Sequence, residues 1–193
     1  MKRICVFAGS SPGARAEYTD AARDLAQALI ARHLGLVYGG GDVGLMGVIA
    51  DTVLELGGDV VGVIPRALVD REVAHHRLTE LRVVASMHDR KAQMEELSDG
   101  FVVLPGGFGT LEESLEILTW SQLGIHSKPC GLLNVVGYYD TLLQFLDQTV
   151  DAEFLKPENR NLVLVDGSAS DLLDQFEKYD PPKVRKWVDS NQT

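Results

Sequence analysis

The stretch LPGGFGTLEE, residues 104–113, joins a glycine-rich loop to two carboxylates at the start of an apolar helical pattern. Glycine lets backbone N–H groups approach an anion closely, and a helix beginning near Thr110 would add free amides and the positive end of its dipole. The stretch therefore predicts a cradle for a phosphate group. The Walker pattern GxxxxGK[ST] is absent, so hydrolysis of nucleoside triphosphates is not expected.

Glu113 has two interpretations. In the first, Thr110 and Glu113 form a capping box, Thr-x-x-Glu, and the glutamate only closes the helix end. In the second, Glu113 is a reactive carboxylate, because it shares an apolar stripe with Ile117 and Trp120 beside the phosphate loop. A charge on such a stripe is costly unless it is paired or used, and the helix N-terminus would help to keep it ionised.

The stretch MHDRKAQM, residues 87–94, offers a partner for this carboxylate. Arg90 opens a stripe that Met94 and Leu97 continue, which is an unusual place for an arginine if the stripe faces the core. The plain alternative is an arginine that reaches the surface or pairs with an acid there. Because the helices of Arg90 and Glu113 follow consecutive strands, we expect both side chains at the same edge of a sheet.

Short apolar strands without alternation are separated by helical patterns along the chain. This order predicts an α/β fold, a Rossmann-like doubly wound parallel sheet with helices on both faces. We expect one domain over residues 1–180, a flexible tail at 181–193, and a cap by Ser86 on one helix. The expected strands are 4–9, 35–41, 59–65, 81–85, 100–107, 129–135 and 162–165; the expected helices are 16–33, 44–56, 87–98, 110–123, 138–150 and 168–179, with an irregular polar segment at 66–80.

Ligands of such sheets bind beyond the carboxyl ends of the strands, and three of these ends are GSSPG, YGGGDVGLMG and LPGGFGT. The second contains the dinucleotide pattern GxGxxG, but the following strand ends at Pro65 without the acid that would bind a ribose. A nicotinamide cofactor is therefore not expected, and tight packing of strand against helix is the plain reason for some of these glycines. The candidate phosphate or ribose contacts in the first two loops are Gly9, Ser10, Gly40, Gly41 and Gly44.

The composition excludes several classes of protein. A formal net charge of −10 argues against a general nucleic-acid binder. No apolar run approaches the ~20 residues that span a bilayer, and no signal peptide is evident, so we expect no membrane contact and a cytoplasmic location. Cys5 and Cys130 lie in apolar runs, and the cysteines and histidines show no ligand spacing. No disulfide, metal or cofactor is expected.

The three stretches YGGGDVGLMG, MHDRKAQM and LPGGFGTLEE together resemble the lonely-guy family of cytokinin-activating enzymes, and the resemblance covers essentially residues 3–165. It implies a phosphoribohydrolase that cleaves the N-glycosidic bond of a nucleoside 5′-monophosphate, releasing the base and ribose 5-phosphate. The implied substrates are adenosine monophosphate and its N6-prenylated derivatives. The family signature PGGxGTxxE is matched by Pro105, Gly106, Gly107, Gly109, Thr110 and Glu113. The implied catalytic pair is Arg90 and Glu113; the other implied nucleotide contacts are Glu72, Lys91, Gly106, Gly107, Phe108, Gly109, Thr110, Leu111, Glu112 and Thr119.

Two other functions stay open, because a fold alone does not fix an activity. Family members have often been labelled lysine decarboxylases, and a pyridoxal-phosphate enzyme could use Lys91 for its Schiff base. A non-catalytic nucleotide carrier or sensor is the other alternative. Leu111, Leu115 and Leu118 form a second apolar stripe on the helix of Glu113, which favours burial against a partner. A homodimer is therefore expected, as the resemblance also implies.

Overall fold

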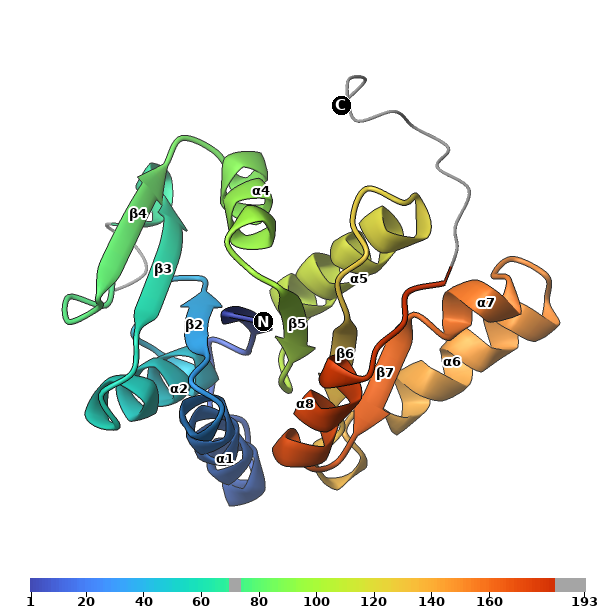
Figure 1. Cartoon of the computed structure of the whole chain (residues 1–193), viewed down its shortest axis with the longest axis horizontal. Coiled ribbons are helices and arrows are strands. Elements are labelled where there is room, and N and C mark those ends of the chain that lie inside the picture. The colour runs from blue at the N-terminus through green and yellow to red at the C-terminus, as the bar shows by residue number, and fades with distance from the viewer. Residues whose placement is uncertain (70–73, 183–193) are drawn as a thin grey trace.

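The computed structural model describes residues 1–69 and 74–182. Within these residues, seven parallel strands form one sheet in the order β4-β3-β2-β1-β5-β6-β7 (Figure 1). Most strands are buried on both faces, as the unalternated apolar runs predict. The strands are β1 (Arg3–Phe7), β2 (Gly35–Tyr38), β3 (Val60–Pro65), β4 (Glu80–Val84), β5 (Gly100–Val103), β6 (Cys130–Leu133) and β7 (Val163–Asp166).

Helices cover both faces of the sheet, which confirms the predicted fold class. Helices α1, α2 and α8 pack on one face, around a core that includes Leu25 and Ile49. Helices α4, α5 and α6 lie on the other face, where Met94 and Ile117 reach the sheet (Figure 1). The helices are α1 (Ala16–Ala31), α2 (Gly44–Glu55), α3 (Arg66–Val69), α4 (Met87–Glu96), α5 (Phe108–Gln122), α6 (Asp140–Asp151), α7 (Pro157–Arg160) and α8 (Ala169–Glu177), with a 3-10 turn η1 (Val135–Gly137) before α6.

The order in which strands are added to the sheet reverses at β1, although all strands stay parallel. Strands β2, β3 and β4 extend to one side of it, whereas β5, β6 and β7 extend to the other. Ile4 of β1 accordingly lies opposite Leu36 of β2 and Gly100 of β5. Such a switch point is where open α/β sheets bind ligands. The three glycine loops follow β1, β2 and β5, so the predicted gathering of these loops at one edge is confirmed.

Serine caps begin two of the helices. The hydroxyl of Ser86 accepts the N–H of Asp89 at 3.1 Å, as predicted, and Ser168 accepts the N–H of Asp171 in the same way on α8. The first interpretation of Glu113, a capping box that begins at Thr110, is wrong. Helix α5 begins at Phe108 with Gly107 as its N-cap, so Thr110 already lies inside the first turn.

Several predicted boundaries differ from the structure for local reasons. Strands β1, β2 and β5 end two, three and four residues before the predicted bounds, because the glycine loops leave the hydrogen-bonded ladder there. The four-residue helices α3 and α7 were not predicted, since a single turn has no periodicity to read. The predicted tail lies almost wholly outside the described residues.

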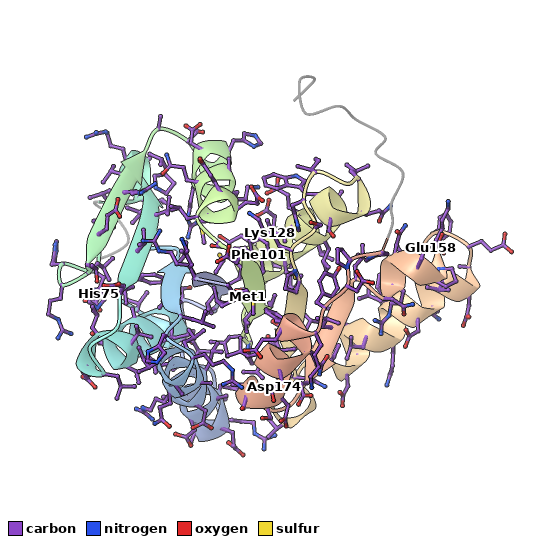
Figure 2. All side chains as sticks on the ribbon, viewed as in Figure 1. Met1, His75, Phe101, Lys128, Glu158 and Asp174 are labelled. Atoms are coloured by element: carbon purple, nitrogen blue, oxygen red, sulfur yellow. The ribbon has the colours of Figure 1, made fainter. Side chains whose placement is uncertain are left out.

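The core contains both cysteines as free thiols. Phe7 stacks on Phe101, labelled in Figure 2, with ring centroids 6.0 Å apart. Burial raises the pKa of the Cys5 thiol well above its ordinary value, and that of Cys130 to about 12.

Among the described helices, none is both long and apolar enough to cross a membrane.

Candidate active site

Arg90 and Glu113 form a nearly buried ion pair. Helix α4 returns from the edge strand β4 toward β5, and this brings Arg90 beside α5. Its Nη1 lies 3.4 Å from Oε1 of Glu113, and the two side chains are only 8% and 11% exposed. The predicted meeting of the two residues at one edge is confirmed, and the alternative of a surface arginine is wrong.

Backbone carbonyls hold the guanidinium in place. Nε of Arg90 donates to the carbonyl of Val63 at 3.1 Å, and Nη2 donates to the carbonyl of Gly39 at 3.3 Å. These carbonyls belong to β3 and to the residue that follows β2. A Cβ on Gly39 would lie 2.0 Å from Nη2, so any larger residue there would displace the guanidinium from its present position. The first glycine of the GxGxxG pattern thus has a reason unrelated to a dinucleotide.

Glu113 lies in the second turn of α5 on the side that faces the sheet, with 9% of its surface exposed. Its carboxylate is close enough to the core for its negative charge to affect the pKa of the Cys5 thiol. After burial, the negative charge of Glu113 is the next cause that raises the pKa of that thiol. A carboxylate fixed by an arginine at the edge of the sheet can stabilise positive charge that develops on a ligand.

The glycines before and inside the first turn of α5 differ in how closely their surroundings would approach a side chain. A Cβ on Gly106 would lie 2.1 Å from Oγ1 of Thr110, so the buried threonine occupies the space of a side chain. A Cβ on Gly107 or Gly109 would have nothing within 4 Å. The packing of the described chain therefore does not demand glycine at these two positions. Glycine leaves this end of the helix uncovered, and its first amides have no intrahelical acceptor.

A cavity of about 300 Å³ lies at the switch point, between the loop at 9–13 and the loop at 105–107. Gly9 and Ser10 line it, as do Tyr18 and Tyr138. Gly44 brings the start of α2 against the first of these loops, since a Cβ there would lie 2.3 Å from the carbonyl carbon of Ser10. Phosphate-sized ligands fit a cavity of this size, at the place that the topology favours.

Lys91 connects α4 to α5 through two ion pairs. Its Nζ lies 2.6 Å from Oε1 of Glu112 and 2.9 Å from Oε2 of Glu116. Burial alone would lower the pKa of Lys91, but the hydrogen bonds from the two carboxylates raise it above its ordinary value. The ammonium group is therefore held charged. This is the opposite of the free amine that a Schiff-base lysine requires.

The remaining predicted contacts are distributed unevenly. Phe108 is 93% exposed at the first residue of α5, and Leu111 is half-buried. Thr119 is exposed, and its hydroxyl donates to the carbonyl of Leu115. Thr119 lies six residues, or about 9 Å of helix, beyond Glu113. The structure does not bring Thr119 to the ion pair. Glu72 lies outside the described residues.

Spacing in the sequence did not predict a cluster beside the second glycine loop. Side chains of Asp42, Asp51 and His75 lie within 4.8 Å of one another; His75 is labelled in Figure 2. Nδ1 of His75 accepts the N–H of Arg77, so Nε2 carries the proton and donates to Asp51 at 3.0 Å. Because the Arg77 guanidinium also bonds Asp51, protein groups already use these donors and acceptors. The cluster ties the segment after 73 to Gly40, whose carbonyl accepts the N–H of His75.

Two tyrosines that contact residues 104–107, the PGG loop, were also missed. Tyr138 and Tyr139 each donate a side-chain hydrogen bond to a carbonyl of that loop. They follow Gly137, and the flanking Asn134 bonds the N–H of Tyr139. The pattern Asn-x-x-Gly-Tyr-Tyr is a turn signal in the sequence, but which strand end the turn contacts follows only from the order of the sheet.

Solved structures share this fold. The molybdenum cofactor carrier protein from Chlamydomonas reinhardtii matches with a TM-score of 0.67 over 92% of this chain and 96% of the carrier, at 19% identity. The X-ray structure of a structural-genomics target matches with a TM-score of 0.71 over 93% of this chain and 100% of the target, at 24% identity. At these identities the likeness is one of fold alone.

Similarity in sequence is much closer to a set of named enzymes. A family model described as "Possible lysine decarboxylase" matches residues 46–176. A cytokinin riboside 5′-monophosphate phosphoribohydrolase of Arabidopsis thaliana is 54% identical over 181 residues, covering 94% of this chain and 79% of the relative. A probable enzyme of the same name from Oryza sativa subsp. japonica is 54% identical over 182 residues, covering 94% and 74%. The resemblance is thereby confirmed, and the chain belongs to the family of the cytokinin riboside 5′-monophosphate phosphoribohydrolases.

Proposed function

We propose that this chain hydrolyses the N-glycosidic bond of nucleoside 5′-monophosphates to the free base and ribose 5-phosphate. Its substrates are adenosine monophosphate and N6-prenylated derivatives, in line with the names of its relatives. One observation carries the proposal: Glu113, which is paired with the buried Arg90, lies in the second turn of the helix whose uncovered first amides follow β5 beside the switch point. This combination offers an anion site for a phosphate and a carboxylate for the sugar.

The proposed chemistry follows from the charges of the pair. Departure of a purine leaves oxocarbenium character at the anomeric carbon, as in glycoside hydrolysis. The carboxylate of Glu113 stabilises this charge and activates the attacking water. Arg90 does not donate a proton, because a guanidinium stays charged in proteins. It holds Glu113 in position and anchors substrate oxygens, while amides of residues 106–110 bind the 5′-phosphate.

The two alternatives have less support. A pyridoxal-phosphate decarboxylase would need Lys91 as an amine, but two carboxylates hold it as a cation. A carrier on the same fold would have no use for a buried carboxylate fixed by an arginine beside the ligand. A cytoplasmic location stays a prediction that agrees with two free, buried thiols.

We further propose a homodimer that uses the outer face of α5. Leu115 is 43% exposed on this face, and Leu111 and Leu118 beside it are half-buried. Thr119, one of the implied nucleotide contacts, lies on the same face and away from the ion pair of its own chain. A second subunit packed here would cover the leucines, and Thr119 of each subunit would then lie closer to the ion pair of the other subunit.

The test is release of base from defined nucleotides. Purified protein is incubated with adenosine monophosphate, prenylated adenosine monophosphate and the nucleosides without phosphate, and the released bases are quantified by chromatography. We expect release from the monophosphates only. In Glu113→Gln, release falls by 10²-fold or more because the amide cannot stabilise the cation, whereas binding of ribose 5-phosphate persists. Hydrolysis by this variant near the wild-type rate would refute the role of Glu113.

A further inference from the structure

Each of three successive carbonyls in the PGG loop accepts one hydrogen bond from outside the loop. The hydroxyl of Tyr139 donates to Leu104 at 2.7 Å, the N–H of Gly9 donates to Pro105 at 3.0 Å, and the hydroxyl of Tyr138 donates to Gly106 at 2.7 Å. Two of the three donors are adjacent side chains of one corner, the segment 134–140 between β6 and α6. The loop is thus held from its carbonyl side.

The corner that supplies these hydroxyls has an unusual backbone. Val136 has φ 46° and ψ 34°, in the left-handed region that a β-branched residue rarely adopts, and Gly137 follows with φ 77°. Asn134 stabilises this turn, because its Oδ1 accepts the N–H of Tyr139 and its Nδ2 donates to Asp140, both at 2.7 Å. Such strain persists where surrounding contacts impose it, and it is concentrated at functional sites.

The geometry of the peptide bond gives the two hydroxyls different consequences. In a planar trans peptide the C=O of one residue and the N–H of the next point in opposite directions. The bond from Tyr138 to Gly106 therefore fixes the direction of the Gly107 N–H, at the N-cap of α5. The bond from Tyr139 to Leu104 orients no amide, because the next residue is Pro105 and has no N–H.

We propose that Tyr138 is a positioning residue for the phosphate cradle. Its hydroxyl holds the peptide between Gly106 and Gly107 so that the Gly107 N–H is directed away from the corner and toward the bound 5′-phosphate. This role rests on the proposed function, since it assumes a phosphorylated sugar at the PGG loop. Tyr138 lines the cavity at the switch point and is 41% exposed, so it contributes little to the core. Tyr139 is only 2% exposed and is a core residue.

The adjacent tyrosines form a matched pair for a test, because both lose one hydroxyl and one 2.7 Å hydrogen bond on replacement by Phe. Dissociation constants of ribose 5-phosphate and of ribose are measured by calorimetry for the wild type, Tyr138→Phe and Tyr139→Phe, together with thermal unfolding. Tyr138→Phe should weaken binding of ribose 5-phosphate about fivefold, the factor for ~1 kcal/mol, and leave binding of ribose and the melting temperature nearly unchanged. Tyr139→Phe should lower the melting temperature and leave the affinity for ribose 5-phosphate within twofold of the wild type.

The proposal is overturned if Tyr138→Phe binds ribose 5-phosphate as the wild type does, if both variants weaken it equally, or if the wild type does not bind it. The assay is independent of turnover. A wild type that binds ribose 5-phosphate but releases no base would therefore refute the proposed hydrolysis and leave the role of Tyr138 to the comparison of the two variants. Where turnover is observed, Tyr138→Phe should raise KM for adenosine monophosphate and leave kcat nearly unchanged.

Discussion

At several positions of this site, the neighbouring atoms decide which residue type can be accommodated. Sequence spacing made Arg90 and Glu113 candidates, because a charge on an apolar helical stripe is costly unless it is paired, and the family resemblance then implied that they are the catalytic pair. Spacing was not enough for Gly39, whose pattern suggested a nucleotide loop, whereas the structure gives its space to the guanidinium of Arg90. The difference arises because spacing in the sequence indicates only which residues share a face of one helix. The space beside Gly39 depends on how the end of β2, α4 and α5 pack together, which spacing does not indicate.

This steric contact predicts the outcome of Gly39→Ala. The added methyl group would overlap Nη2 of Arg90 at 2.0 Å, so the guanidinium must move and its ion pair with Glu113 is disturbed. We expect base release to fall by about 10²-fold, as for other misplacements of about 1 Å at a catalytic group. The measurement is kcat/KM for adenosine monophosphate.

Gly167→Ala is the control for Gly39→Ala, because a Cβ at position 167 would have only the carbonyl oxygen of Asn134 within 4 Å, at 3.9 Å. It should keep the wild-type rate. Full activity of Gly39→Ala would show that Arg90 tolerates displacement, and the orienting role would then be wrong.

Helix α5 is the element on which the site depends, and both of its ends are set by neighbours. Its first turn begins at the PGG loop, and its last turns contact the segment that leads to β6. The sequence predicted the helix and its buried carboxylate. It placed the start two residues late, because Thr-x-x-Glu imitates a capping box where Gly107 is the actual N-cap. Propensity alone does not distinguish the two, since the choice depends on Thr110 packing against Gly106.

His126 connects α5 to the segment before β6 and makes stability depend on pH. Nε2 of His126 donates to the carbonyl of Ile117 at 2.9 Å, and Nδ1 accepts the N–H of Lys128. Burial lowers the pKa of His126 below its ordinary value. The unfolded chain therefore binds a proton near pH 6.5 that the folded chain does not bind, and stability falls as the pH drops through this value.

The measurement is the melting temperature between pH 7.5 and 5.5 for the wild type and His126→Gln. We expect the variant to have a lower melting temperature at pH 7.5 and a shallower loss on acidification, because the titrating group is gone. Equal slopes for the two proteins would contradict the assignment of this pH dependence to His126.

At the scale of the whole molecule, the order of the strands decides where the site lies. Alternating strands and helices in the sequence predicted the doubly wound class and the shared edge of the three glycine loops. They did not predict that the corner at 134–140 would contact the PGG loop, because this contact requires β6 to lie beside β5. Likewise, the apolar stripe of Leu111, Leu115 and Leu118 predicted a second buried face and a homodimer that covers it, and the homodimer stays a prediction.

The homodimer proposal makes a prediction at this scale. Leu115→Lys puts a charge on the outer face of α5, and we expect the protein to sediment as a monomer with little loss of melting temperature, because Leu115 is 43% exposed. Leu56→Lys is the matched control, since Leu56 is 46% exposed at the end of α2, on the opposite side of the sheet. A dimer for Leu115→Lys, or a monomer for the wild type at micromolar concentration, would contradict the proposed interface.

The central position of β1 also affects the order in which the protein can assemble during synthesis. Among the strands of this sheet β1 is synthesised first, yet one of its two neighbours, β5, follows some ninety residues later in the chain. Until β5 is made, the edge of β1 at Ile4 and Val6 lacks the partner strand that it has in the folded sheet. The proposed nucleotide pocket, which lies between the loops that follow β1 and β5, can consequently be completed only after these two strands have paired.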